Sequence, residues 1–135
     1  MYIDNYRKSM RKLFVLLSLL FCLSLSAMEY VGTLQMASGY TLSDVRVSLD
    51  EQGNLTLYRV KFSRMMPVRV DVVLPNVTLR QDSTTTVIFG DNIIPTMDGK
   101  PKPERIATQL QGNADDSSIT FRCLLGGKGI QFQGK

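Results

Sequence analysis

The sequence predicts an all-β domain, a small antiparallel meander barrel of eight or nine strands, preceded by a helical signal peptide. Three observations lead to this fold class. Nearly every segment after residue 29 alternates apolar and polar residues with period two, which is typical of half-buried strands. Short turns rich in Gly, Asp and Asn separate these segments, and no stretch repeats its apolar residues at helical spacing. Closure into a barrel is expected because it removes the edge strands of a short, Val-rich sheet.

Residues 1–26 have the pattern of a secretory signal peptide, with a basic head followed by an apolar run over 13–27. The run is shorter than the ~20 apolar residues of a membrane-spanning helix. We therefore expect cleavage near Ala27, a mature domain over residues 27–135, and no membrane span after cleavage. The expected location is secreted, periplasmic or at the cell envelope. Lipid anchoring at Cys22 is the less favoured alternative, because the bulky Phe21 precedes this cysteine.

Composition and charge exclude several function classes. The chain of 135 residues has no His, so it cannot use a His-based triad or a His metal site. Of its 16 Lys and Arg and 12 Asp and Glu, residues 1–26 hold four basic groups and one acid, which leaves a net charge of +1 on the remainder. Basic and acidic residues alternate along that remainder without forming a basic run. We therefore expect no nucleic-acid partner.

Each strand is expected between two turn signals. The expected strands run over residues 30–37, 45–49, 55–62, 68–74, 77–80, 85–89, 105–111, 118–124 and 130–133. In the third of these, the apolar face switches after Leu57, which predicts a bulge or a strand covered on both faces. Residues 90–104 are expected to form a long loop, because Pro101 and Pro103 lack the N–H groups that a strand donates.

No catalytic residue, metal ligand or cofactor site is predicted. The adjacent acidic pairs Asp50-Glu51 and Asp115-Asp116 fall in turns, where Asp commonly accepts hydrogen bonds from the local backbone. The serines lack a His base and a Gly-x-Ser-x-Gly elbow. Cys123 shares its strand phase with apolar neighbours, so we expect a buried, unreactive thiol.

Two features suggest binding. Met36, Met65 and Met66 could line an apolar mouth that adapts to a ligand, although methionines also fill gaps in cores. Lys128 is the one cation among the glycines of residues 126–129, at the tip of an expected hairpin, and could contact a protein partner.

Several segments together resemble the calycin-like (lipocalin-like) barrel domains of secreted bacterial proteins. They are Tyr30–Leu34, Gly53 with the strand after it, Met66-Pro67-Val68, residues 70–77 and the closing segment Ile130–Gly134. The resemblance implies an eight-stranded antiparallel barrel that binds a small molecule.

The expected function is therefore a secreted or envelope-associated, non-enzymatic binding module, with a small apolar or amphipathic molecule in the barrel mouth. The alternative is a filled barrel that acts through its surface, as a protein-interaction or hydrolase-inhibitor domain. Its partner would then be an envelope or extracellular protein. Eight-stranded barrels are only just wide enough for side chains to fill them. Whether the interior holds a cavity or is packed with side chains therefore decides between these two functions.

Overall fold

The alternating segments form strands throughout residues 27–135, which are the residues that the computed structural model describes. The expected signal peptide and Cys22 lie outside the described residues. The strands are β1 (Ala27–Met36), β2 (Thr41–Asp50), β3 (Leu55–Val60), β4 (Val70–Leu74), β5 (Thr78–Asp82), β6 (Thr85–Gly90), β7 (Thr96–Met97), β8 (Lys100–Pro101), β9 (Ala107–Ala114), β10 (Ile119–Leu125) and β11 (Lys128–Gly134). A short 3-10 helix, η1 (Pro103–Arg105), precedes β9, and residues 27–135 contain no α-helix. The all-β prediction is confirmed.

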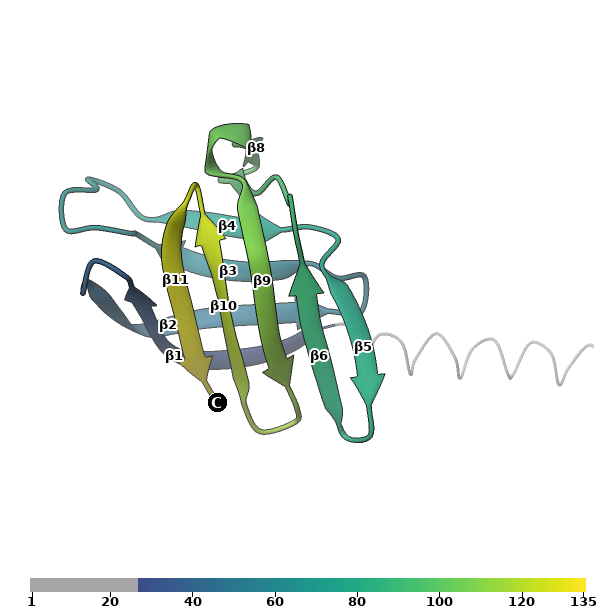
Figure 1. Ribbon diagram of the computed structural model, residues 1–135. Helices are drawn as coiled ribbons and strands as arrows, with labels where there is room; N and C mark the ends of the chain where they lie inside the picture. Colours follow the sequence, from purple (N-terminus) through teal and green to yellow (C-terminus); the bar gives the residue numbers. More distant parts are fainter. Residues whose placement is uncertain (1–26) are drawn as a thin grey trace, which may run out of the picture.

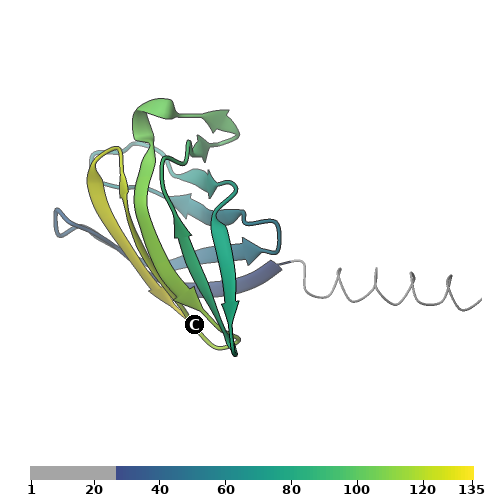
Figure 2. The ribbon, with the colours of Figure 1, turned by 45° about the vertical axis from the view of Figure 1, so that its right-hand side comes forward.

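All eleven strands belong to one antiparallel sheet, in the order β5-β6-β9-β10-β11-β1-β2-β3-β4-β7-β8. The sheet curls so that β5, β6 and β9 to β11 cross in front of β1 to β4, as Figures 1 and 2 show. β1 and β11, far apart in the sequence, pair at the seam between these halves, with Gly32 opposite Gly134. A Cβ atom on Gly32 would overlap the carbonyl oxygen of Gln133, so this close crossing requires glycine.

The expected count of eight or nine strands is wrong, because β7 and β8 lie within the predicted loop 90–104. Asp98 and Gly99 have φ angles of 50° and 81°, which is the left-handed pair that a two-residue hairpin turn needs. Pro101 is tolerated because β8 is the last strand of the sheet and needs no donor on its free edge. The other nine strands correspond to the nine expected segments, with ends that differ by a few residues.

The sheet is a curled half-barrel, whereas a closed barrel was expected. Its end strands, β5 and β8, do not pair with each other in the described part of the chain. Pro75 and Asn76, with a φ angle of 58° at Asn76, change the direction of the chain after β4. As a result β5 does not pair with β4, and β4 pairs with β7 instead. One isolated bridge, between Ile93 and Ala107, ties the segment before β7 to the start of β9.

Three bulges allow the sheet to curl. Asp44 in β2, Arg59 in β3 and Gln109 in β9 have φ angles of 57°, 52° and 54°, and each lies where the pairing register shifts. The bulge at Arg59 confirms the prediction for the third strand. It lets both Leu57 and Val60 face the core, where they are 1% and 0% exposed.

Side chains fill the space inside the curled sheet. Phe121 and Phe132 are fully buried and stack with their ring centroids 5.4 Å apart. Leu and Ile side chains from both halves of the sheet surround them. The fully buried aliphatic residues include Leu34, Leu55, Leu57, Leu74, Ile88, Leu110 and Ile119. The core therefore occupies the centre of the curled sheet.

Candidate functional site

A pocket of about 540 Å³ lies at the end of the sheet where β1, β3 and β10 finish. The turn between β1 and β2, the turn between β10 and β11, the start of the β3–β4 loop and η1 surround it. We call it the mouth pocket. It is lined by Met36, Ala37, Ser38, Phe62, Ser63, Arg105, Leu125, Gly127, Lys128, Gly129 and Ile130.

Backbone hydrogen bonds fix the wall of the mouth pocket. The N–H of Ala37 donates to the carbonyl of Gly129 at 2.9 Å, which joins the two hairpin turns. The N–H of Gly126 donates to the carbonyl of Ile106 at 3.0 Å, which attaches the β10–β11 turn to the residue after η1. A Cβ atom on Gly126 would meet Arg105 at 3.3 Å, so the turn and η1 are in close contact.

The mouth pocket combines an apolar floor with a cationic rim. Met36, Leu125 and Ile130 form the floor and are 4–6% exposed. Arg105 and Lys128 are exposed and stand on two different elements of the rim. Among residues 27–135, no acidic side chain lines this pocket. Such a lining suits a molecule with an apolar body and an anionic group.

The structure places the four sequence-predicted site residues in two locations. Met36 and Lys128 both line the mouth pocket. Met65 and Met66 lie in the β3–β4 loop and are not among its lining residues; Met65 is 90% exposed, and the Met66 sulfur accepts a hydrogen bond from the N–H of Phe62 at 3.2 Å. Sequence reasoning missed Phe62 and Arg105 as site residues, because it placed them at the ends of the expected strands 55–62 and 105–111. In the structure they lie in the β3–β4 loop and in η1.

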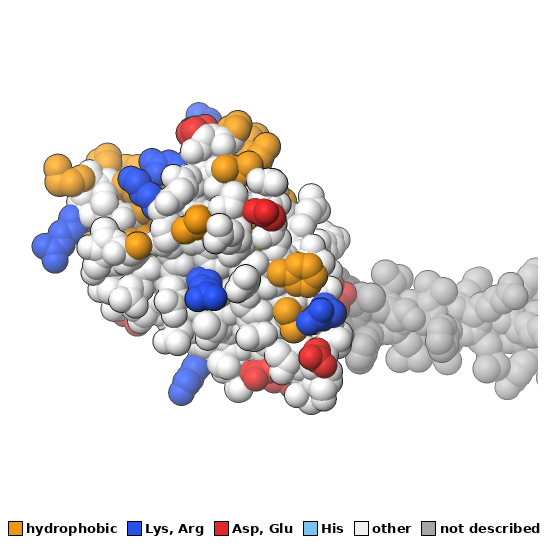
Figure 3. Space-filling view, viewed as in Figure 1, with side chains coloured by type: hydrophobic (Ala, Val, Ile, Leu, Met, Phe, Trp, Pro, Cys, Tyr) orange, Lys and Arg blue, Asp and Glu red, His pale blue; other side chains and the backbone are white. Residues whose placement is uncertain are grey.

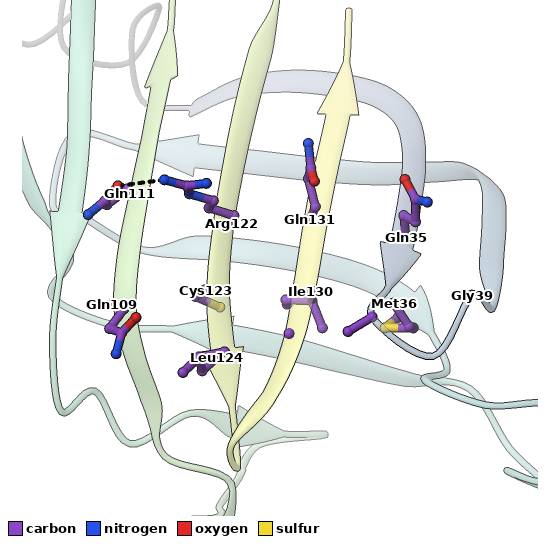
Figure 4. A pocket seen from close by; sticks show the side chains of 12 residues that line it. Gln35, Met36, Gly39, Gln109, Gln111, Arg122, Cys123, Leu124, Ile130 and Gln131 are labelled. Atoms are coloured by element: carbon purple, nitrogen blue, oxygen red, sulfur yellow. Dashed lines mark hydrogen bonds between the residues drawn. The ribbon is translucent and has the colours of Figure 1, made fainter.

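A second hollow, of about 590 Å³, lies on the outer face of β1, β9, β10 and β11 (Figure 4). Strand register places Gln35, Gln131, Arg122 and Gln111 in one row across these four strands. Arg122 Nη2 donates to Gln111 Oε1 at 3.3 Å. This row offers amide donors and acceptors and one cation, which suits a polar partner with many hydrogen-bonding groups.

Cys123 also borders the outer hollow, but its side chain is 4% exposed. Burial raises the pKa of the Cys123 thiol to about 12. This burial confirms the prediction from the strand phase, and the raised pKa keeps the thiol protonated at neutral pH.

The first residue of each acidic pair, Asp50 and Asp115, accepts hydrogen bonds within its own turn. Asp50 Oδ1 accepts hydrogen bonds from the N–H groups of Gln52 and Asn54, both at 2.9 Å. Asp115 Oδ1 accepts hydrogen bonds from the backbone N–H and hydroxyl of Ser117 and from the N–H of Ser118, which lower the pKa of Asp115. Within residues 27–135, no three His, Cys, Asp or Glu residues form a group that could hold a metal ion. No helix in this part of the chain is long and apolar enough to cross a membrane.

Comparison with known proteins did not identify a similar protein. No family model matches the chain, and no curated protein and no solved structure shows significant similarity to it.

Proposed function

We propose that the domain is a non-enzymatic binding module, and that its mouth pocket holds a small amphipathic anion. The observation that carries this proposal is the pairing of an apolar floor with two cations, Arg105 and Lys128, in one pocket. A volume of about 540 Å³ falls within the range of small-molecule sites, ~300–1,000 Å³. The sequence features of export and the calycin-like segments support a secreted or envelope-associated setting for this module.

The ligand is assigned to the mouth because the interior is full. Phe121 and Phe132 occupy the centre of the sheet, so the apolar part of a ligand would rest on Met36, Phe62 and Ile130 at its end. The anionic group would lie at the rim beside the two cations. Its attraction to them would be screened in part by solvent, since both side chains are exposed.

A protein partner is the second candidate, and the filled interior favours it. A domain whose centre is occupied by core side chains such as Phe121 and Phe132 can act through its surface, as an interaction module or as an inhibitor of a hydrolase. The row of Gln and Arg side chains on the outer face and the exposed Lys128 turn would be the contact regions.

Binding of 1-anilinonaphthalene-8-sulfonate, an apolar fluorescent anion, tests the first candidate. We expect saturable binding to the folded chain, and a gain in unfolding free energy of ~2.7 kcal/mol at a hundredfold excess over the dissociation constant. Replacing both rim cations, Arg105→Gln with Lys128→Gln, should weaken binding about tenfold, because two charge-assisted contacts are lost. Ala37→Phe should weaken it as well, by filling the pocket entrance.

Lys100→Gln is the matched control for charge. Lys100 is exposed but does not line the mouth pocket, so this variant should bind the dye as the unmodified chain does. Nile red, which is apolar and uncharged, should bind more weakly and should not respond to the Arg105 and Lys128 substitutions. Absence of saturable dye binding, or equal weakening by Lys100→Gln, would contradict the proposal.

A further inference from the structure

The β3–β4 loop, residues 61–69, exposes apolar side chains at its tip. Met65 is 90% exposed and Val68 is 61% exposed, the two highest values among the large exposed hydrophobic residues of the described chain. In Figure 1 this loop protrudes at the upper left, beyond the strands that it joins. Neither residue lines the mouth pocket or the outer hollow. The loop therefore presents a convex apolar tip to its surroundings.

Cations flank the apolar tip. The β3–β4 loop contains three cations, Lys61, Arg64 and Arg69, and no Asp or Glu. Figure 3 shows basic and hydrophobic side chains together at this corner of the molecule. The nearest acidic residue along the chain, Asp71, is engaged elsewhere, because its Oδ1 accepts a hydrogen bond from the N–H of Arg59 at 2.8 Å.

Internal hydrogen bonds give the loop a defined shape. The N–H of Phe62 donates to the Met66 sulfur at 3.2 Å, and the N–H of Met66 donates to the carbonyl of Ser63 at 3.3 Å. Arg69 Nη1 donates to the carbonyl of Arg59 at 3.4 Å across the base of the loop. Met66 is thus half-buried against the backbone of its own loop, while Met65 and Val68 are exposed.

We propose that the β3–β4 loop docks on the surface of an anionic phospholipid bilayer. Met65 and Val68 enter the boundary between headgroups and acyl chains, and Lys61, Arg64 and Arg69 contact the lipid phosphates. A bilayer suits this surface better than a protein does, because a fluid interface accommodates a convex tip without a matching cavity. This inference does not depend on what the mouth pocket binds.

A single tryptophan at the tip tests the proposal, since the chain contains none. In the full chain, Met65→Trp should show a blue-shifted emission and protection from aqueous iodide on addition of vesicles of phosphatidylcholine and phosphatidylglycerol in equal parts. Vesicles of phosphatidylcholine alone should give a much smaller shift. Adding Arg64→Gln and Arg69→Gln should weaken the response, by roughly fivefold in lipid concentration for each charge.

Gln52→Trp is the matched control, because Gln52 is exposed in the β2–β3 turn at the other end of the sheet. The apolar segment 13–27 is identical in all variants, so its own contact with lipid cannot produce a signal specific to Met65→Trp. An unshifted Met65→Trp emission on phosphatidylglycerol vesicles would overturn the proposal, as would an equal shift in Gln52→Trp or an equal response to phosphatidylcholine alone. A shift on addition of polyglutamate but not of vesicles would instead indicate an acidic protein partner.

Discussion

The thiol of Cys123 provides a quantitative test of the core. β10 places this side chain between the buried residues Phe121 and Leu125 on the inner face of the sheet, where it is 4% exposed. Burial raises its pKa from 9.0 to about 12, which is three pH units. At neutral pH the thiolate fraction of the folded protein is therefore about a thousandfold lower than that of a free cysteine.

Labelling kinetics measure this difference. In a Cys22→Ser background, Ellman's reagent at pH 8 should react with Cys123 about a thousandfold more slowly in the folded protein than in guanidinium chloride. Stability should also depend on pH, because the folded pKa of the thiol lies above its unfolded value. The folded state keeps its proton while the unfolded state loses it, so the stabilisation is complete below pH 9 and decreases between pH 9 and about 12. Native labelling within tenfold of the denatured rate would refute the burial of this thiol.

Three other substitutions test the bulges, the turns and the strand contacts. Asp71→Ala removes the acceptor of the Arg59 N–H and should lower the free energy of unfolding by ~1–2 kcal/mol in urea denaturation, whereas no loss would mean that the bulge does not need this contact. Asp115→Asn should destabilise the fold at neutral pH, because the hydrogen bonds that Asp115 accepts lower its pKa in the folded state. The largest effect comes from the backbone N–H of Ser117. The gap to the unmodified protein should close as pH falls below about 4; a gap that does not vary with pH would contradict this account. Gly112→Ala would place a methyl group 2.6 Å from a side-chain carbon of β10 and should cost ~1–3 kcal/mol, while an unchanged melting temperature would show that the strands can move apart.

Period-two alternation was sufficient to locate nine strands. Eight of them bury residues of one face in the core, whereas β5 contributes only the half-buried Leu79. It could not locate β7 and β8, which have two residues each and therefore no period. Their signal was the Asp98-Gly99 dipeptide, a common hairpin turn, and the neighbouring prolines obscured it. Barrel closure was not predictable either, because it depends on whether β5 and β8 meet, and the pattern within a strand does not report its partners.

The candidate site could also be predicted only in part, because the pattern within a segment does not report its tertiary contacts. Met36 ends β1 and Lys128 begins β11, and antiparallel pairing of these strands brings them to the same end of the sheet. Arg105 and Phe62 join them through η1 and the β3–β4 loop, whose paths depend on tertiary contacts. For Met65, hydrophobicity gave no indication of exposure, since an apolar residue in a loop can also be half-buried, as the adjacent Met66 is.

The pairing of β1 with β11 has a consequence for the order in which the sheet assembles. Gly32 and Gly134 are about a hundred residues apart in the chain, so this ladder forms only after nearly all of the domain has been synthesised. Until then, β1 and β10 each have an edge with unpaired backbone groups that can pair with another molecule. The nascent chain is thus most prone to aggregation before its last strand has been synthesised. A chain that lacks residues 128–134 would keep both of these edges unpaired.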